Sequence, residues 1–178
     1  MLSEKYREES DSLGTIKVPA DVLYGIHAMR AQENFPDRTL FHVEWYKAMG
    51  LVKLACYKAY RQFRAAVLDR ANNADVPFSL LEARVTDALE SSAAEVSEGK
   101  HFEAFIVPAI NGGAGTSINM NVNEIIANVA LLKLGLQPGS YETIHPIETA
   151  NIYQSTNDVV PTALKVAMMQ LLGSLESQ

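Results

Sequence analysis

The segment "INGGAGTSINMNVNEIIANVALLKLG", residues 110–135, contains a glycine-rich loop and then a helix. From Ile118 onward its apolar residues recur at alternating steps of four and three, the spacing of one face of an α-helix. Gly135, close behind Lys133, is typical of a helix C-terminus. We therefore predict a flexible, donor-rich loop at the N-terminus of a helix. We expect Glu124 to be a carboxylate on the surface of that helix.

A second helix is predicted over residues 42–66, where apolar side chains again recur at steps of three and four. Its predicted buried face consists of Trp45, Met49, Val52, Cys56, Tyr60 and Phe63. The basic residues Lys47, Lys53, Lys58 and Arg61 fall mostly outside that face, so we expect them to be solvated. The turn-forming sequence "NNADVP", residues 72–77, should follow the end of the helix.

Two more helices complete the predicted set. One begins at a capping box, in which Ser79 stands three residues ahead of Glu82. The other must begin within a few residues of Asn157, because Pro161 lacks an amide donor and belongs in the first turn of a helix. This last helix is still apolar and periodic at residue 178, so we expect it to continue beyond the given chain.

The fold class that follows is mainly α. Amphipathic helices joined by short polar turns favour a layer of a helical bundle. Residues 12–24 contain Gly14 and short β-branched stretches, which predict an extended or hairpin-like segment packed against the helices. A chain of 178 residues is long enough for one domain with its own core, and a second complete domain is not expected.

Composition limits the possible functions. A net charge of -6 without a cluster of Lys and Arg argues against nucleic-acid binding. No apolar run approaches the ~20 residues of a membrane span, and the polar start of the chain is unlike a signal peptide. The single cysteine, Cys56, excludes an internal disulfide and, on a helical stripe, favours core packing over a role as nucleophile. We expect a soluble cytoplasmic protein.

Two loops carry the candidate chemistry. "GGAGTS", residues 112–117, and "QSTND", residues 154–158, each place hydroxyl side chains at the N-terminus of a predicted helix. Backbone N–H groups are unpaired there and the helix dipole is positive, so a small carboxylate or phosphate binds without Lys or Arg. The alternative is that these side chains are ordinary helix caps. The residues alone leave both interpretations open.

Other familiar constellations are missing from the sequence. No Gly-Lys-Ser/Thr closes the glycine loop as a nucleotide-binding P-loop requires, and "GAGTSI" lacks the third glycine of a dinucleotide fingerprint. The four histidines are scattered without the spacing of metal ligands. We therefore expect neither a metal nor an organic cofactor.

Three motifs together resemble the aspartase and class II fumarase family. "YREESDSLGTIKVPADVLYGIHAMRAQENF", residues 6–35, is similar to the opening of that family. "GGAGTSINMNVNE", residues 112–124, resembles its first substrate-contacting motif, and "QSTNDVVPTA", residues 154–163, its second. The motifs occur in the family's order and cover nearly the whole chain. Their combination is specific, whereas each motif alone is weak.

The resemblance implies an enzyme that eliminates ammonia or water from a four-carbon dicarboxylate to give fumarate. It implies a helical N-terminal lyase domain, residues 1–150, followed by the start of a long helix of a central bundle, residues 151–178. The complete enzyme is expected to be a homotetramer whose active sites form where three subunits meet. His27 and the threonine of "QSTND" resemble aspartases more than fumarases, so aspartate is favoured over malate.

The resemblance also implies the site residues. Those expected to bind the dicarboxylate substrate are Gly115, Thr116, Ser117, Ser155, Thr156 and Asn157. Possible secondary contacts are His27, Arg30, Asn121 and His145. The family's secondary dicarboxylate site reads His-Pro-Asn-Asp, from which "HPIE" at residues 145–148 departs. The family's serine base and its lysine would lie beyond residue 178, so we expect no catalytic base in this chain and no activity from it alone.

Three hypotheses remain. The first is the N-terminal part of an aspartase, with a class II fumarase as its alternative. The second is a stand-alone module that binds a dicarboxylate without catalysis. The third is a helical domain in which the hydroxyl residues only cap helices.

Overall fold

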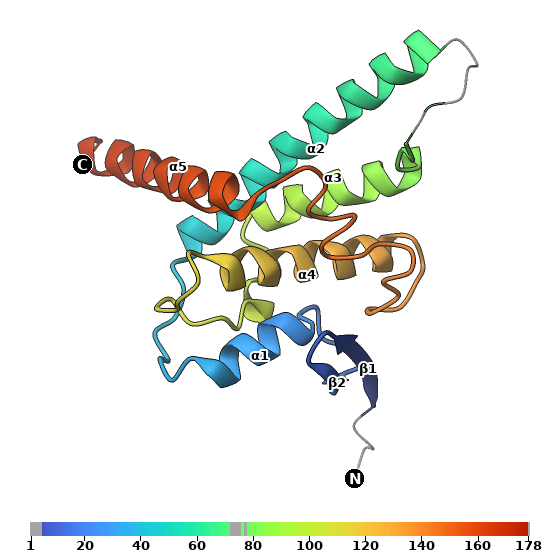
Figure 1. Ribbon diagram of the computed structural model, residues 1–178. Coiled ribbons are helices and arrows are strands. Elements are labelled where there is room, and N and C mark those ends of the chain that lie inside the picture. Colours follow the sequence, from blue (N-terminus) through green and yellow to red (C-terminus); the bar gives the residue numbers. More distant parts are fainter. Residues whose placement is uncertain (1–4, 72–75, 77, 178) are drawn as a thin grey trace.

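The computed structural model describes residues 5–71, 76 and 78–177 and is mainly helical, with a small hairpin near the N-terminus (Figure 1). The elements in chain order are β1 (Tyr6–Asp11), β2 (Gly14–Pro19), α1 (Ile26–Asn34), α2 (Val43–Ala71), α3 (Ala83–Ser97), a 3-10 turn (Phe102–Ala104), α4 (Thr116–Lys133) and α5 (Thr156–Glu176). The predicted fold class is thus confirmed. The predicted turn at residues 72–77 lies, except for residue 76, outside the described residues.

Helix α4 lies at the centre of the fold. Its residues 121–131 are buried without interruption, because α3 covers one side, α1 another, and α5 contacts it as well (Figure 1). The predicted apolar face is buried from Ile118 to Val129, although Leu132 at its end is about half exposed, at 49%. Polar residues on the other faces of α4 are therefore also taken out of water.

Helix α2 packs against both α3 and α5, and its buried face differs from the predicted one. The fully buried large side chains are Tyr46, Met49, Lys53 and Tyr57, whereas the predicted Phe63 is 42% exposed. The expectation that Lys53 is solvated is wrong, because this residue continues the stripe of Met49 and Tyr57 at steps of four. Gly50 lets α2 approach α3 closely, since a Cβ there would collide with the Ser97 backbone.

The start of α3 corrects the predicted capping box. The helix begins at Ala83, with Glu82 as an extended N-cap residue and no side-chain cap, so Ser79 lies before it. The segment just before α3 is hydrogen-bonded to α2 instead. The Leu81 amide donates to the Tyr60 hydroxyl at 2.7 Å, and Arg64 Nε donates to the Leu81 carbonyl at 2.8 Å. These bonds hold the chain extended up to Glu82.

The hairpin is antiparallel and joins β1 to β2 with Arg7 opposite Val18. It confirms the predicted extended segment, although β1 begins before residue 12. Arg7 organises the chain that leads from β2 to α1, because its guanidinium donates to the carbonyl oxygens of Pro19, Ala20, Val22 and Tyr24. Asp11 at the end of β1 accepts two hydrogen bonds from Arg30 of α1. The hairpin is thereby held to the helical body.

Candidate functional site

The glycine loop forms the N-terminus of α4. Gly113, Ala114 and Gly115 all have positive φ values, of 78°, 53° and 85°, in the left-handed region that favours glycine. Gly115 is the N-cap residue, and no side chain caps the helix. A Cβ at Gly115 would lie 2.8 Å from Val160 Cγ1, so only glycine allows the loop to lie this close to α5. The hydroxyl of Thr116 donates to the Gly113 carbonyl at 2.8 Å.

The second predicted loop forms the N-terminus of α5, which begins at Thr156 as the sequence predicted. Ser155 is its N-cap, and its hydroxyl accepts a hydrogen bond from the Asn157 amide at 3.1 Å. For Ser155 the capping interpretation is therefore confirmed. The side chains of Thr156 and Asn157 take no part in this cap. The expectation that Pro161 lies in the first turn is wrong, because the helix begins at Thr156 and Pro161 lies inside it, beyond that turn.

The two helix starts meet at one cavity of about 420 Å³. Its polar lining includes Asn111 and Gly115 from the glycine loop and Asn157 from α5. The apolar lining comes from Trp45, Ile118, Val160, Pro161 and Leu164. A concave, mostly apolar space with a few converging polar groups is typical of small-molecule sites. Of the residues predicted to bind substrate, Gly115 and Asn157 line this cavity.

A direct hydrogen bond also links the two motifs. The side-chain amide of Asn119, one turn into α4, donates to the Thr156 hydroxyl at 3.1 Å. Asn119 is buried, whereas Thr156 is partly accessible. Thr116 and Ser155 are exposed, and Ser117 is partly exposed. The predicted substrate residues therefore gather at two adjoining helix starts, with their hydroxyls at or near the surface.

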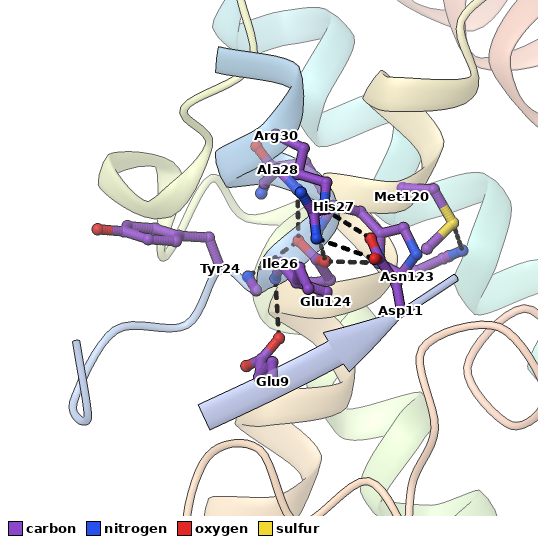
Figure 2. Close-up of polar contacts among 12 residues, drawn as sticks. Glu9, Asp11, Tyr24, Ile26, His27, Ala28, Arg30, Met120, Asn123 and Glu124 are labelled. Atoms are coloured by element: carbon purple, nitrogen blue, oxygen red, sulfur yellow. Dashed lines mark hydrogen bonds and ion pairs between the residues drawn. The ribbon is translucent and has the colours of Figure 1, made fainter. Parts of the chain in front are cut away.

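A third helix N-terminus, that of α1, is occupied by carboxylates of the protein itself (Figure 2). Glu124 of α4 is fully buried and accepts hydrogen bonds from the Gly25, His27 and Ala28 amides at 2.8 to 3.2 Å. Glu9 of β1 accepts from the Ile26 amide at 2.8 Å. The expectation of a surface carboxylate at Glu124 is wrong, because α4 is buried on this face and the orphan donors of α1 need acceptors.

The four possible secondary residues all have protein partners. His27 Nδ1 lies 3.1 Å from Glu124 Oε1, and the bond to that carboxylate raises the pKa of His27 (Figure 2). Arg30 pairs with Asp11. Asn121 is buried and bonded to the backbone at Ala104, Ile106 and Val107, and His145 Nδ1 accepts from the Ile147 and Glu148 amides. None of the four lines the cavity between the helix starts. Their contact with a ligand stays a prediction.

Sequence reasoning missed the polar groups of α2 that hold the second motif. Lys53 is fully buried and donates to Gln154 Oε1 at 3.0 Å, and burial lowers the pKa of Lys53 to about 7. Tyr57, one turn later, donates to the Ala150 carbonyl. Between these attachments Tyr153 has a φ of 52°, which is unusual for a residue other than glycine. The spacing of four between Met49, Lys53 and Tyr57 was the available signal.

Two features are absent from the described residues. Within them, no group of three or more His, Cys, Asp or Glu side chains is arranged to hold a metal ion. None of the helices in this part of the chain combines the length and apolar character that a membrane crossing requires.

Comparison with known proteins places the chain in a family. The family model described as lyase matches residues 14–178. An aspartate ammonia-lyase from a Bacillus species is 42% identical over 95% of this chain and 33% of its own length. A class II fumarate hydratase from Halobacterium salinarum is 40% identical over 96% of this chain and 33% of its own length.

A solved structure agrees. The fumarate lyase:delta crystallin from Brucella melitensis bound to cobalt superposes with a TM-score of 0.85 at 35% identity, over 97% of this chain and 35% of that one. This chain thus spans about a third of the length of the curated relatives it matches. The hairpin, the helices and both loop motifs described above all fall within the matched region, apart from the first strand. The chain belongs to the aspartase and class II fumarase family of lyases.

Proposed function

We propose that this chain is the N-terminal part of a cytoplasmic aspartate ammonia-lyase, which eliminates ammonia from L-aspartate to give fumarate. The observation that carries the proposal is the meeting of two helix N-termini at one cavity, with Gly115 and Asn157 in its wall. Both helix starts direct uncapped or partly capped backbone donors and the positive end of a dipole toward this region. Such a place suits a small dicarboxylate, although the chain as a whole carries a net charge of -6.

The chemistry of the elimination explains why donors are needed. When the Cβ proton of aspartate leaves, the neighbouring carboxylate takes up the electron pair and becomes an aci-carboxylate with a second negative charge. Hydrogen-bond donors placed where this charge develops lower the barrier. Ser117, Ser155, Thr156 and Asn157 would be the side chains that supply such donors, and Gly115 would let the backbone approach the ligand. Thr116 would join them by turning its hydroxyl proton from the Gly113 carbonyl to the ligand.

The remaining parts of the catalyst would lie outside this cavity. Residues 1–150 would form the N-terminal lyase domain, and residues 151–178 would begin a helix of a central bundle that joins four copies into a homotetramer. The exposed apolar side chains of α5 that would enter this bundle include Met168, Met169, Leu172 and Leu175. The base that removes the Cβ proton would come from outside these residues, so the chain by itself would be inactive. Without a base, proton abstraction loses roughly 10²–10⁴-fold in rate.

Two other functions have specific support. A class II fumarate hydratase, acting on malate and fumarate, is favoured by the Halobacterium salinarum relative at 40% identity. A stand-alone module that binds a dicarboxylate without catalysis is favoured by the hydrophobic core of the described residues, which α4 shares with α1, α2, α3 and α5. Such a module would bind fumarate and convert nothing.

Intact mass and turnover of the native polypeptide, captured from its source, test the proposal. The expected result is a polypeptide close to three times the length of this chain that forms fumarate from aspartate. Formation of fumarate from malate alone would support the hydratase instead. A native polypeptide of 178 residues that binds fumarate without turnover would support the module.

A pair of matched variants tests the site itself. Thr116→Ala removes a hydroxyl at the start of α4, whereas Ser174→Ala removes one from an exposed position of α5 far from the cavity. The first variant should weaken fumarate binding and the second should leave it unchanged. If Thr116→Ala alters only the free energy of unfolding, the hydroxyl is a structural element of the loop and the site assignment is wrong.

A further inference from the structure

Three asparagine side chains connect the two motifs from within. Asn119 and Asn123 project from α4 and are buried, and Asn151 lies in the loop before α5. The amide nitrogens of Asn119 and Asn123 both donate to Asn151 Oδ1, at 3.1 and 3.2 Å. Asn119 donates in addition to the Thr156 hydroxyl at 3.1 Å. The cluster therefore ends at a residue that the proposed function places against the substrate.

The orientation of each amide follows from one backbone group. Asn151 Nδ2 lies 2.8 Å from the Gln154 carbonyl oxygen, which can only accept a hydrogen bond. The amide of Asn151 must therefore direct its nitrogen to Gln154 and its oxygen to α4. Asn119 and Asn123 then have to meet that oxygen with their nitrogens, because two carbonyl oxygens would repel each other.

Nothing on the opposite side of these amides favours the reverse orientation. The buried oxygens of Asn119 and Asn123 have no hydrogen-bond partner in the described part of the chain. The second donor of Asn123 points to the sulfur of Met120 at 3.9 Å, a weak acceptor that again suits a nitrogen (Figure 2). The direction of the whole chain of hydrogen bonds is thus set by the Gln154 carbonyl.

This direction determines whether the Thr156 hydroxyl donates or accepts in its bond with Asn119. An amide nitrogen cannot accept, so Thr156 Oγ1 must be the acceptor from Asn119. The hydroxyl then keeps its own proton, for which the described residues offer no acceptor. We propose that Asn119 is a positioning residue that commits the Thr156 hydroxyl to donate a hydrogen bond to a ligand carboxylate. The inference rests on the proposed dicarboxylate site and adds why the Thr156 hydroxyl acts there as a hydrogen-bond donor.

The consequence is selectivity for an acceptor at one place in the site. A carboxylate oxygen at Thr156 completes the chain of bonds from Gln154 through Asn151 and Asn119. A group with only donors, such as an ammonium, could use the second lone pair of Thr156 Oγ1 but would leave the hydroxyl proton unpaired. For a substrate that carries both carboxylates and an ammonium, this feature orients a carboxylate toward the start of α5.

A double-mutant cycle on the native-length protein tests the proposal, with fumarate as the probe and calorimetry as the readout. Thr156→Val should raise the Kd roughly 10- to 100-fold, the effect of losing one hydrogen bond to a charged group. Asn119→Ala should raise it roughly 3- to 10-fold when Thr156 is present and have no further effect in the Thr156→Val background. An equal effect in both backgrounds would overturn the proposal.

Asn123→Ala is the matched control. It removes an amide bond to the same Asn151 oxygen without touching Thr156, so it should lower stability while fumarate affinity stays within about twofold. A loss of affinity equal to that of Asn119→Ala would mean that the cluster acts only through general stability, and it would overturn the assignment of Asn119.

A ligand-free measurement separates this inference from the proposed function. Nuclear Overhauser contacts between the side-chain amide protons of Asn119 and the methyl group of Thr156 are expected, because the nitrogen faces the hydroxyl. Their absence would show the reverse orientation and overturn the inference, whether or not fumarate binds. A protein that shows these contacts but binds no fumarate would refute the proposed dicarboxylate site and support the orientation of the Asn119 amide.

Discussion

Replacing Lys53 by methionine should stabilise the protein at neutral pH and remove a specific pH dependence. Burial lowers the pKa of Lys53 from 10.5 to about 7, and its ammonium has Gln154 Oε1 as its side-chain partner at 3.0 Å. At about 1.4 kcal/mol per pH unit between these values, keeping the charged form in the fold costs about 5 kcal/mol at neutral pH and below. Methionine has a similar length and carries no charge, so it avoids this cost. The lost hydrogen bond to Gln154 lowers the stability of the variant by about 1 kcal/mol.

The sign of the pH dependence follows from proton binding. The unfolded chain keeps the Lys53 proton up to about pH 10.4, whereas the folded protein releases it above about pH 7. Between these values the unfolded state binds more protons, so the stability of the wild type should rise with pH. The rise amounts to about 2 kcal/mol between pH 7 and pH 9. The Lys53→Met variant should lack it.

Urea denaturation at pH 6, 7, 8 and 9 provides the measurement, as the difference between the wild type and Lys53→Met. Cys56 is the ionisable group that acts on Lys53, and burial raises the pKa of its thiol. Cys56 is retained in the variant, so its own contribution largely cancels in the difference. Lys58→Met, at an exposed position of the same helix, is the control and should show no such change. Parallel curves for the wild type and Lys53→Met from pH 7 to 9 would refute the reasoning.

Three other predictions concern the N-terminus of α1. Gly25→Ala should destabilise by about 1–3 kcal/mol in urea denaturation, because its Cβ would lie 2.7 Å from Glu9 Oε2, whereas Gly173→Ala, with open space around it, should not. Glu124→Ala should cost about 3 kcal/mol or more by the same measurement, since it leaves several buried amides without an acceptor. His27 should contribute stability that is complete below about pH 6.5 and declines as pH rises through its raised folded pKa, so the stability difference between wild type and His27→Gln should shrink from pH 5.5 to 8.5.

The helices could be predicted because their apolar spacing is local information. The stripe from Ile118 to Val129 and the start of α5 near Asn157 both depend on residues within a few turns of each other. The second face of a helix that is buried all round carries no such signal. Glu124 and Lys53 were both assigned to water because they are charged, and only the packing of distant elements shows that they are buried and bonded.

The candidate site was predictable in part for the same reason. A glycine loop with hydroxyl residues before a helix, as at Gly115 and Thr116, can be recognised from adjacent residues. Two tertiary contacts, by contrast, link positions more than thirty residues apart. The glycine loop meets Asn157 at the cavity, and Asn119 is hydrogen-bonded to Thr156. Periodicity assigns Asn119 to α4 but does not specify what its amide contacts.

Glu124, whose carboxylate accepts hydrogen bonds from the first amides of α1, is synthesised long after α1 itself. Glu124 lies 99 residues after Gly25 and accepts a hydrogen bond from the Gly25 amide. At roughly 5–20 residues per second, a ribosome needs about 5 to 20 s to make the intervening chain. During that interval the nascent segment from the hairpin to Asn34 has the acceptor Glu9 but lacks its second one. The N-terminus of α1 can therefore gain its full set of acceptors only after α4 has left the ribosome.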